Sequence, residues 1–159
     1  VIDANKQYTA TLETTKGKIV IELLPDKAPL AVNSFVFLAR EGWFDNAPWH
    51  RVLEGFVAQS GDPSGTGVFG PGYLFKNETN DLKFDQAGVV GMANSGADRN
   101  GSQFFITLAA TPNLDGGYTI FGRVVEGMDV VQSLTLRDPQ SGGVLPEPDL
   151  ILSVTIEEK

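Results

Sequence analysis

The chain has 159 residues, of which 42% are hydrophobic and 20% charged, with a formal net charge of −8 and an isoelectric point near 4.5. This acidic balance argues against a nucleic-acid partner, because such binding depends on lysine and arginine side chains that neutralise phosphates. The lack of cysteine excludes a disulfide scaffold, a thiolate nucleophile and a cysteine-based zinc site. The length predicts a single domain over residues 1–159, in which residues 1–7 form an N-terminal extension.

The first third of the chain predicts a hairpin followed by a helix. Apolar and polar residues alternate over 8–13 and again over 18–24, and Lys16-Gly17 supplies a turn between the two runs. Pro29 suits the first turn of a helix, where its missing N–H is not needed. Beyond it, one apolar helical face is formed by Val32, Phe35, Val36 and Ala39, and Gly42 can end the helix.

The rest of the chain predicts short strands and glycine-rich loops, with one more helix. Residues 61–72 form a loop, since they include five glycines and two prolines. Strands are expected over 88–93, 102–108, 118–125 and 150–157, a turn over 115–117, and a helix over 128–134. Roughly eight strands with a helix near each end predict a mainly β fold, a closed antiparallel barrel capped by two α-helices.

The sequence indicates a soluble domain but does not decide its compartment. No apolar run approaches the roughly 18 residues that would span a bilayer. The chain begins at Val1 without a methionine, so we expect that an upstream segment has been removed. Both a cytoplasmic and an exported location remain open. No apolar stripe is left over for an obligate partner, so we expect a monomer.

Several kinds of chemistry are poorly supported by the residues present. His50 is the only histidine, and no serine lies in a G-x-S-x-G elbow. One histidine, no cysteine and scattered carboxylates provide no metal-ligand spacing. Gly65-Thr66-Gly67 is too short for a phosphate loop. We therefore expect no metal, no cofactor and no covalent catalysis.

One strand offers a small binding surface. In the expected strand over 102–108, Gln103 and Phe105 point to one side, while Phe104 and Ile106 point to the other. If the second pair fills the core, the first pair forms an apolar and polar surface on the outside of the barrel. The pattern alone favours the simpler alternative, in which Phe105 is a packing residue and Gln103 is solvated.

Two longer motifs resemble one known family. WHRVLEGFVAQSGD (residues 49–62) resembles the F-H-R-[VI]-[IV]-x-G-F-[MV]-x-Q-x-G-D signature of the cyclophilin peptidyl-prolyl isomerases. GMANSGADRNGSQFFIT (residues 91–107) resembles the M-A-N-[AS]-G-x-x-[TS]-N-[GS]-S-Q-F-F-I block of that family. Weaker matches follow over 113–116, 121–124 and 127–128. The resemblance runs in order from about residue 9 to residue 157, and it implies an eight-stranded antiparallel barrel with two helices, without a cofactor.

The resemblance implies an enzyme that catalyses rotation about Xaa-Pro peptide bonds and so assists protein folding. Arg51 matches the catalytic arginine, which donates to the prolyl nitrogen; Phe56 and Gln59 complete the implied catalytic set. The implied substrate-binding set is Val57, Gly65, Ala93, Asn94, Ser95, Gln103, Phe105, Asn113, Leu114 and Tyr118. Within these sets an apolar pocket receives the proline ring, and the backbone of residues 93–95 binds the residues before it. The implied partners are proline-containing peptides and unfolded or partly folded proteins.

Some positions depart from the family pattern or from simple alternation. Asn113 stands where many members carry a tryptophan associated with cyclosporin binding, so weak cyclosporin binding is expected. Tyr118 replaces a common histidine and Val57 a common methionine; together with Asn113 they keep open an alternative, a proline-peptide-binding or chaperone module with little turnover. His50 is expected to be structural, beneath the site. Phe56 and Gln59 have opposite parity yet share a site, so an irregularity is expected between them.

Overall fold

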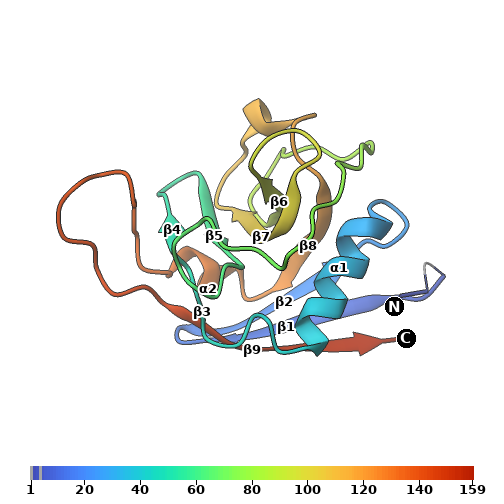
Figure 1. The fold of residues 1–159 in the computed structure, drawn as a ribbon, viewed down its shortest axis with the longest axis horizontal. Helices are drawn as coiled ribbons and strands as arrows, with labels where there is room; N and C mark the ends of the chain where they lie inside the picture. The colour runs from blue at the N-terminus through green and yellow to red at the C-terminus, as the bar shows by residue number, and fades with distance from the viewer. Residues whose placement is uncertain (1, 4) are drawn as a thin grey trace.

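The structure is a computed structural model that describes residues 2, 3 and 5–159. Val1 and Ala4 lie outside the described residues, so the predicted extension over 1–7 is covered only in part. Nine strands and two helices make up the described fold (Figure 1). The strands are β1 (Tyr8–Thr14), β2 (Gly17–Leu23), β3 (Ala47–Pro48), β4 (Arg51–Val52), β5 (Val57–Ser60), β6 (Val89–Asn94), β7 (Asn100–Thr107), β8 (Ile120–Glu126) and β9 (Leu150–Glu158). The helices are α1 (Pro29–Arg40) and α2 (Met128–Gln132), with a short 3-10 helix η1 (Pro112–Leu114).

All nine strands belong to one antiparallel sheet in the order β3-β9-β1-β2-β8-β6-β7-β5-β4. Only Trp49 and His50 separate its two edge strands along the chain, so the sheet curls back on itself into a half-barrel (Figure 1). The predicted mainly β, antiparallel fold with two helices is confirmed; the barrel expected to be closed and eight-stranded is a half-barrel of nine strands, whose edge strands β3 and β4 do not pair with each other. The two-residue strands β3 and β4 are too short to produce an alternating pattern in the sequence.

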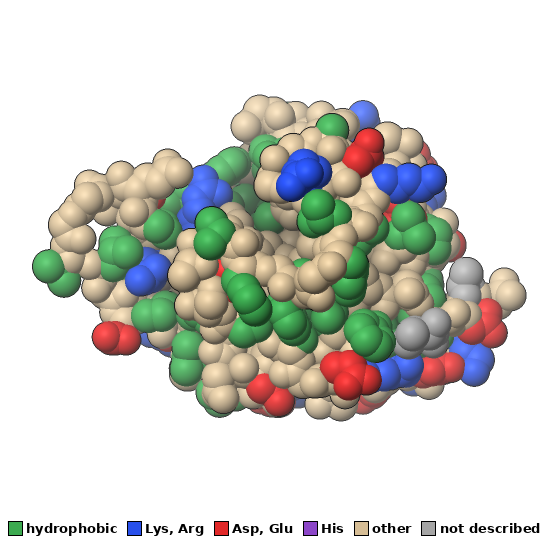
Figure 2. Space-filling model, in the orientation of Figure 1, with side chains coloured by type: hydrophobic (Ala, Val, Ile, Leu, Met, Phe, Trp, Pro, Cys, Tyr) green, Lys and Arg blue, Asp and Glu red, His purple; other side chains and the backbone are tan. Residues whose placement is uncertain are grey.

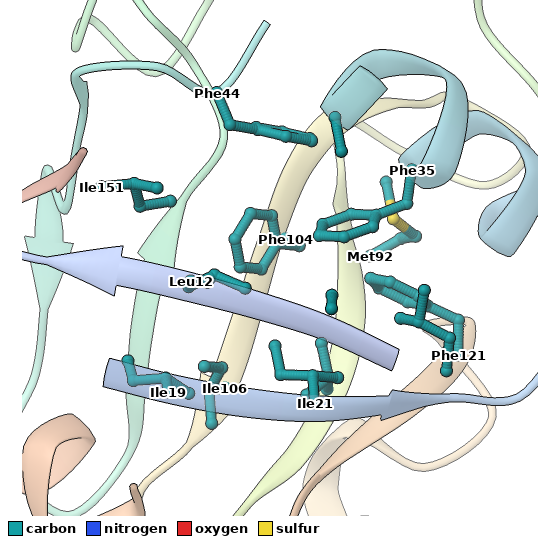
Figure 3. Close-up of a cluster of buried hydrophobic side chains, with 14 of the residues drawn as sticks. Leu12, Ile19, Ile21, Phe35, Phe44, Met92, Phe104, Ile106, Phe121 and Ile151 are labelled. Carbon is teal, nitrogen blue, oxygen red and sulfur yellow. The ribbon is translucent and has the colours of Figure 1, made fainter. Parts of the chain in front are cut away.

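The main core lies between the inner face of the sheet and α1. Phe35, from the helix, packs against Phe44, Phe104 and Phe121 with ring centroids 4.9 to 5.5 Å apart (Figure 3). The apolar face predicted for this helix is buried, because residues 32, 35, 36 and 39 all face the sheet. This packing anchors β7 from the inside.

The two ends of the described chain meet in the sheet. The predicted hairpin is present, with Tyr8 opposite Leu23, and the other edge of β1 pairs with β9, with Tyr8 opposite Glu158. The second helix is shorter than the predicted 128–134, since the chain leaves the α-helix after Gln132 in a tight turn. Among the described residues, no helix combines the length and apolar character needed to cross a membrane.

The alternation predicted for β7 separates two apolar clusters. Phe104 and Ile106 are fully buried in the main core. Phe105 points to the opposite face and joins a second, smaller cluster with Val57 and Phe84. Both expectations for this strand hold in part: Phe105 is a packing residue, and it also forms the base of a hollow on the outer face.

Candidate active site

A cavity of about 400 Å³ lies on the outer face of the sheet, above the second cluster. Its size is within the range of small-ligand and peptide-side-chain sites. Strands β4, β5, β6 and β7 supply most of its wall, and loops after β5, after η1 and after α2 complete it. The lining residues are His50, Arg51, Phe56, Val57, Gln59, Thr66, Gly67, Val68, Ala93, Asn94, Gln103, Phe105, Leu114, Tyr118, Pro139 and Gln140.

The floor of the cavity is aromatic and held in place from below. The Phe105 ring stacks on Phe84 at 5.5 Å and meets the edge of Tyr118 at 5.6 Å. Gly91 makes this position possible, since a Cβ there would stand 2.8 Å from Cζ of Phe105. Leu114 packs at the margin of the same cluster. The result is a rigid apolar surface suited to a flat aliphatic ring.

One wall is a chain of hydrogen bonds that begins at the arginine. Arg51 and Gln59 face each other across β4 and β5, and Nη1 of Arg51 donates to Oε1 of Gln59 at 3.1 Å. Nε2 of Gln59 donates to Oε1 of Gln103 at 2.9 Å, and Nε2 of Gln103 donates to the carbonyl of Gly67 at 2.7 Å. Each amide is both acceptor and donor, so its orientation is determined by its neighbours. The guanidinium is thereby held beside the apolar floor.

Phe56 faces the arginine from the turn before β5. The Arg51 guanidinium carbon lies 5.9 Å from the centroid of the Phe56 ring, within the range of a cation–π contact. Phe56 precedes the first residue of β5, in a turn in which Gly55 has φ 68° and the Phe56 N–H bonds the carbonyl of Leu53. The irregularity expected between Phe56 and Gln59 therefore lies before Phe56, since β5 pairs with β7 without a register shift from Val57 to Ser60; both residues nevertheless line the cavity.

Asp62 organises the loop that receives the end of the hydrogen-bond chain. Its buried carboxylate accepts bonds from the backbone N–H groups of Ser64, Gly67 and Phe69, and from the hydroxyls of Ser64 and Thr66. Burial acts to raise the pKa of Asp62, but the bonds from Ser64 and from the backbone outweigh it and hold that pKa below its usual value. The Gly67 carbonyl therefore occupies a position determined by an ionised carboxylate.

At the end of β6 the backbone borders the cavity, while the side chain of Asn94 is hydrogen-bonded to other parts of the chain. The ladder between β6 and β7 shifts register between Met92 and Asn94, which sets Ala93 in an irregular position. Nδ2 of Asn94 donates to the carbonyl of Gly117, and Oδ1 accepts from the N–H of Gly96. With its amide engaged in this way, Asn94 can meet a ligand mainly through its main chain.

Most of the predicted site residues come together in this structure. Ten line the cavity: Arg51, Phe56, Val57, Gln59, Ala93, Asn94, Gln103, Phe105, Leu114 and Tyr118. Ser95 lies in an adjoining hollow. Gly65 and Asn113 lie outside the lining of both: Gly65 packs on Pro48, whose Cγ would be 2.9 Å from an added Cβ, and Asn113 is exposed on η1.

Other lining residues were not predicted from the sequence. Pro139 and Gln140 reach the cavity from the loop between α2 and β9, which Arg137 fastens by donating to the carbonyls of His50 and Pro146. That placement depends on contacts across 87 residues, so no local pattern could indicate it. Thr66, Gly67 and Val68 enter through the fold of the loop after β5.

His50 borders the cavity although it is almost fully buried. It is 4% exposed, and burial lowers its pKa, which keeps the imidazole neutral near pH 7. Its Nδ1 has no hydrogen-bond partner among the described residues. A buried, neutral ring fits the structural role expected for it, but the hydrogen bond expected with that role is not present at Nδ1. Within the described part of the chain, no group of three or more acidic, histidine or cysteine residues could hold a metal ion.

Comparisons with known proteins identify the family. The family model described as cyclophilin type peptidyl-prolyl cis-trans isomerase matches residues 9–156. The chain is 48% identical over 149 residues to the peptidyl-prolyl cis-trans isomerase cypE of Dictyostelium discoideum, covering 91% of this chain and 96% of that protein. It is 50% identical over 141 residues to the isomerase ppi1 of Schizosaccharomyces pombe, covering 86% and 91%.

A solved structure agrees with the sequence relatives. A cyclophilin type peptidyl-prolyl cis-trans isomerase from Cryptosporidium parvum, determined in the presence of the dipeptide Ala-Pro, superposes with a TM-score of 0.85 at 31% identity, over 94% of this chain and 98% of that one. The sequence relatives and the solved structure thus point to the same family across nearly the whole chain. The chain belongs to the cyclophilin-type peptidyl-prolyl cis-trans isomerases.

Proposed function

We propose that this cavity isomerises Xaa-Pro bonds in peptides and in unfolded or partly folded proteins, with Arg51 as the group that acts on the prolyl nitrogen. The observation that carries the proposal is the position of the Arg51 guanidinium. It is held by Gln59 at 3.1 Å, beside an apolar floor centred on Phe105. A fixed cation next to a ring-sized apolar surface suits a proline ring bound next to its own amide bond.

The chemistry required is the loss of amide resonance, with no bond made or broken. The C–N bond has partial double-bond character, and rotation about it has a barrier of about 18–20 kcal/mol. As the bond twists, the nitrogen lone pair is released and becomes a hydrogen-bond acceptor. A donor placed at that nitrogen binds the twisted state more strongly than either planar state, which is the condition for acceleration.

The remaining lining residues support this by holding the chain on both sides of the twisting bond. The ring would lie on Phe105, bounded by Phe56 and Leu114, and the backbone before it would meet Ala93 and Asn94. The hydrogen-bond chain through Gln59 and Gln103 limits the motion of the arginine. A donor that is already oriented needs little reorganisation when the transition state forms.

The proposal is tested by NMR exchange spectroscopy on a Xaa-Pro peptide. Removing one oriented hydrogen-bond donor costs on the order of 10²–10³ in rate at other enzyme sites, so Arg51→Ala should lose about that factor in kcat/KM. Arg123→Ala is the matched control, because Arg123 is an exposed arginine on β8 that pairs with Glu22, away from the cavity. If Arg51→Ala retained the wild-type rate, the role of Arg51 would be wrong. Tight peptide binding with no acceleration by wild type would instead support the proline-binding module.

The rim of the cavity near η1 affects the expected affinity for cyclosporin. Asn113 is exposed and lies outside the cavity lining, so the rim has no large apolar side chain at that position. We infer weak cyclosporin binding with isomerisation retained. Asn113→Trp should tighten cyclosporin binding in a calorimetric titration, while kcat/KM on a short proline peptide stays within about two-fold.

A further inference from the structure

A second hollow of about 410 Å³ adjoins the proposed active site, and Arg99 is the one charged residue among the described residues of its lining. The two hollows share six residues as a common wall: Gln59, Gly67, Val68, Ala93, Asn94 and Gln103. An extended chain advances about 3.3 Å per residue, so a peptide with its proline in the first hollow brings a neighbouring side chain to the second. What this second hollow attracts then affects which prolines are processed.

Arg99 gives the second hollow a positive charge without a carboxylate partner. Two of the five arginines pair with acidic residues: Arg40 with Glu158 and Arg123 with Glu22. Arg99 instead donates from Nε to the hydroxyl of Ser95 at 3.2 Å, and among the described residues no carboxylate oxygen lies within 4.0 Å of it. In a chain with a net charge of −8, Arg99 thus gives the second hollow a cation without a carboxylate partner, as Arg51 does for the first.

The turn that carries Arg99 holds the side chain in position. The Arg99 N–H bonds the carbonyl of Gly96, and the Ser95 N–H bonds the carbonyl of Arg99. Cδ of Arg99 lies 3.6 Å from where a Cβ on Gly96 would stand, so its stem folds back over the turn. The neighbouring Asp98 is engaged elsewhere, since its Oδ1 accepts from the N–H of Asn77 at 3.0 Å. The Nη1 and Nη2 groups of Arg99 remain available to a ligand.

Apolar side chains line another part of the second hollow. Phe69 and Leu74 are 53% and 52% exposed, and both line it, together with Pro71. In the view of Figure 2, hydrophobic side chains gather across the middle of the molecule, and Lys and Arg side chains are scattered around them. A side chain with a methylene stem and a terminal carboxylate suits both the apolar side chains and Arg99, and of the two acidic amino acids glutamate has the longer stem.

We propose that Arg99 makes the second hollow select an acidic side chain, glutamate above others, within three residues of the substrate proline. This inference rests on the proposed function, because it assumes that the proline occupies the first hollow. The pairing is between solvent-exposed groups, so its contribution is modest: roughly a two- to five-fold gain in kcat/KM for a glutamate peptide over its glutamine counterpart. It should shrink in about 1 M salt, where exposed charges are screened beyond about 3 Å.

The test is a peptide series in which Glu, Gln or Lys occupies each position within three residues of a single proline, on either side. Exchange spectroscopy gives kcat/KM for each peptide, and chemical-shift titration of the protein gives its Kd. At one position wild type should favour Glu over Gln and Gln over Lys. Arg99→Gln should abolish the order, and Arg99→Glu should reverse it. Arg123→Gln, which removes the same charge from β8, should leave the preference for Glu over Gln over Lys unchanged.

Two results would overturn the inference: equal values for Glu and Gln at every position in wild type, or a preference for Glu that survives in Arg99→Gln. These are distinct from failure of the proposed function. If wild type isomerised none of the peptides, the proposed function would fall, while the Kd values would still report whether Arg99 selects acidic chains. If it isomerised all of them equally and bound them equally, only the inference about Arg99 would fall.

Discussion

Asp62→Asn tests whether one buried carboxylate maintains the loop behind the proposed active site. The change conserves size and removes a single charge. Oδ2 of Asp62 accepts from the N–H groups of Gly67 and Phe69 and the hydroxyl of Thr66, and Oδ1 accepts from the N–H and the hydroxyl of Ser64. An amide keeps one acceptor only, and its NH₂ must face donors at the other position.

The magnitude follows from the better of the two amide orientations. If the remaining oxygen takes the Oδ2 position, the NH₂ faces Ser64, whose hydroxyl can turn to accept but whose N–H cannot. A buried donor left without a partner costs about 1–3 kcal/mol. The three bonds that persist also change from charged to neutral, and charged bonds are roughly twice as strong. We expect a loss of about 2–4 kcal/mol in the free energy of unfolding.

The assay is urea unfolding followed by fluorescence or circular dichroism. Asp85→Asn is the matched control. Asp85 is exposed, so this substitution removes the same charge from the surface of the protein. Since the loop carries the Gly67 carbonyl that Gln103 binds, kcat/KM on a proline peptide should also fall. A urea midpoint for Asp62→Asn equal to that of Asp85→Asn would refute the reasoning, and so would an unchanged kcat/KM in a clearly destabilised variant.

Three further outcomes follow from the same structure. Because the pKa of Asp62 is lowered on folding, its contribution is complete above about pH 4 and is lost as pH falls through the folded value, so acid should reduce the urea midpoint of wild type more than that of Asp62→Asn. Gly91→Ala places a methyl 2.8 Å from the Phe105 ring and should cost about 1–3 kcal/mol of stability while weakening peptide binding measured by titration. Gln140→Ala truncates an exposed side chain at the cavity rim. The free energy of unfolding, measured by thermal unfolding, should stay within about 0.5 kcal/mol of the wild-type value, while the KM for a proline peptide rises.

The features that could be predicted from the sequence are those determined by residues close together in the chain. The hairpin of β1 and β2 and the face of α1 follow from periodicity within a dozen residues, and they appear at nearly the predicted bounds. The opposed directions of Gln103 and Phe105 against Phe104 and Ile106 follow from the same rule.

The unpredicted parts depend on contacts between distant segments. Alternation could not show that Phe105 meets Phe84 and Tyr118 or that Pro139 reaches the cavity, because each position results from packing across the fold. Asp62 sits in a loop whose conformation its own carboxylate organises, and its sequence context of glycines predicted only a loop. The motif over 49–62 placed Arg51 and Gln59 in one site. It could not reveal the chain of hydrogen bonds that continues from them through Gln103 to Gly67.

The position of β1 between β2 and β9 has a consequence during protein synthesis. β2 leaves the ribosome directly after β1, but β9 begins only at Leu150. The edge of β1 that pairs with β9 therefore stays unpaired while a further 136 residues are synthesised. At 5–20 residues per second that wait lasts roughly 7 to 27 s. During this interval the nascent hairpin presents a seven-residue row of unpaired backbone groups, a template for wrong partners on neighbouring chains. Glu13, the exposed charged residue of the strand, is the feature that limits such pairing until the last strand arrives.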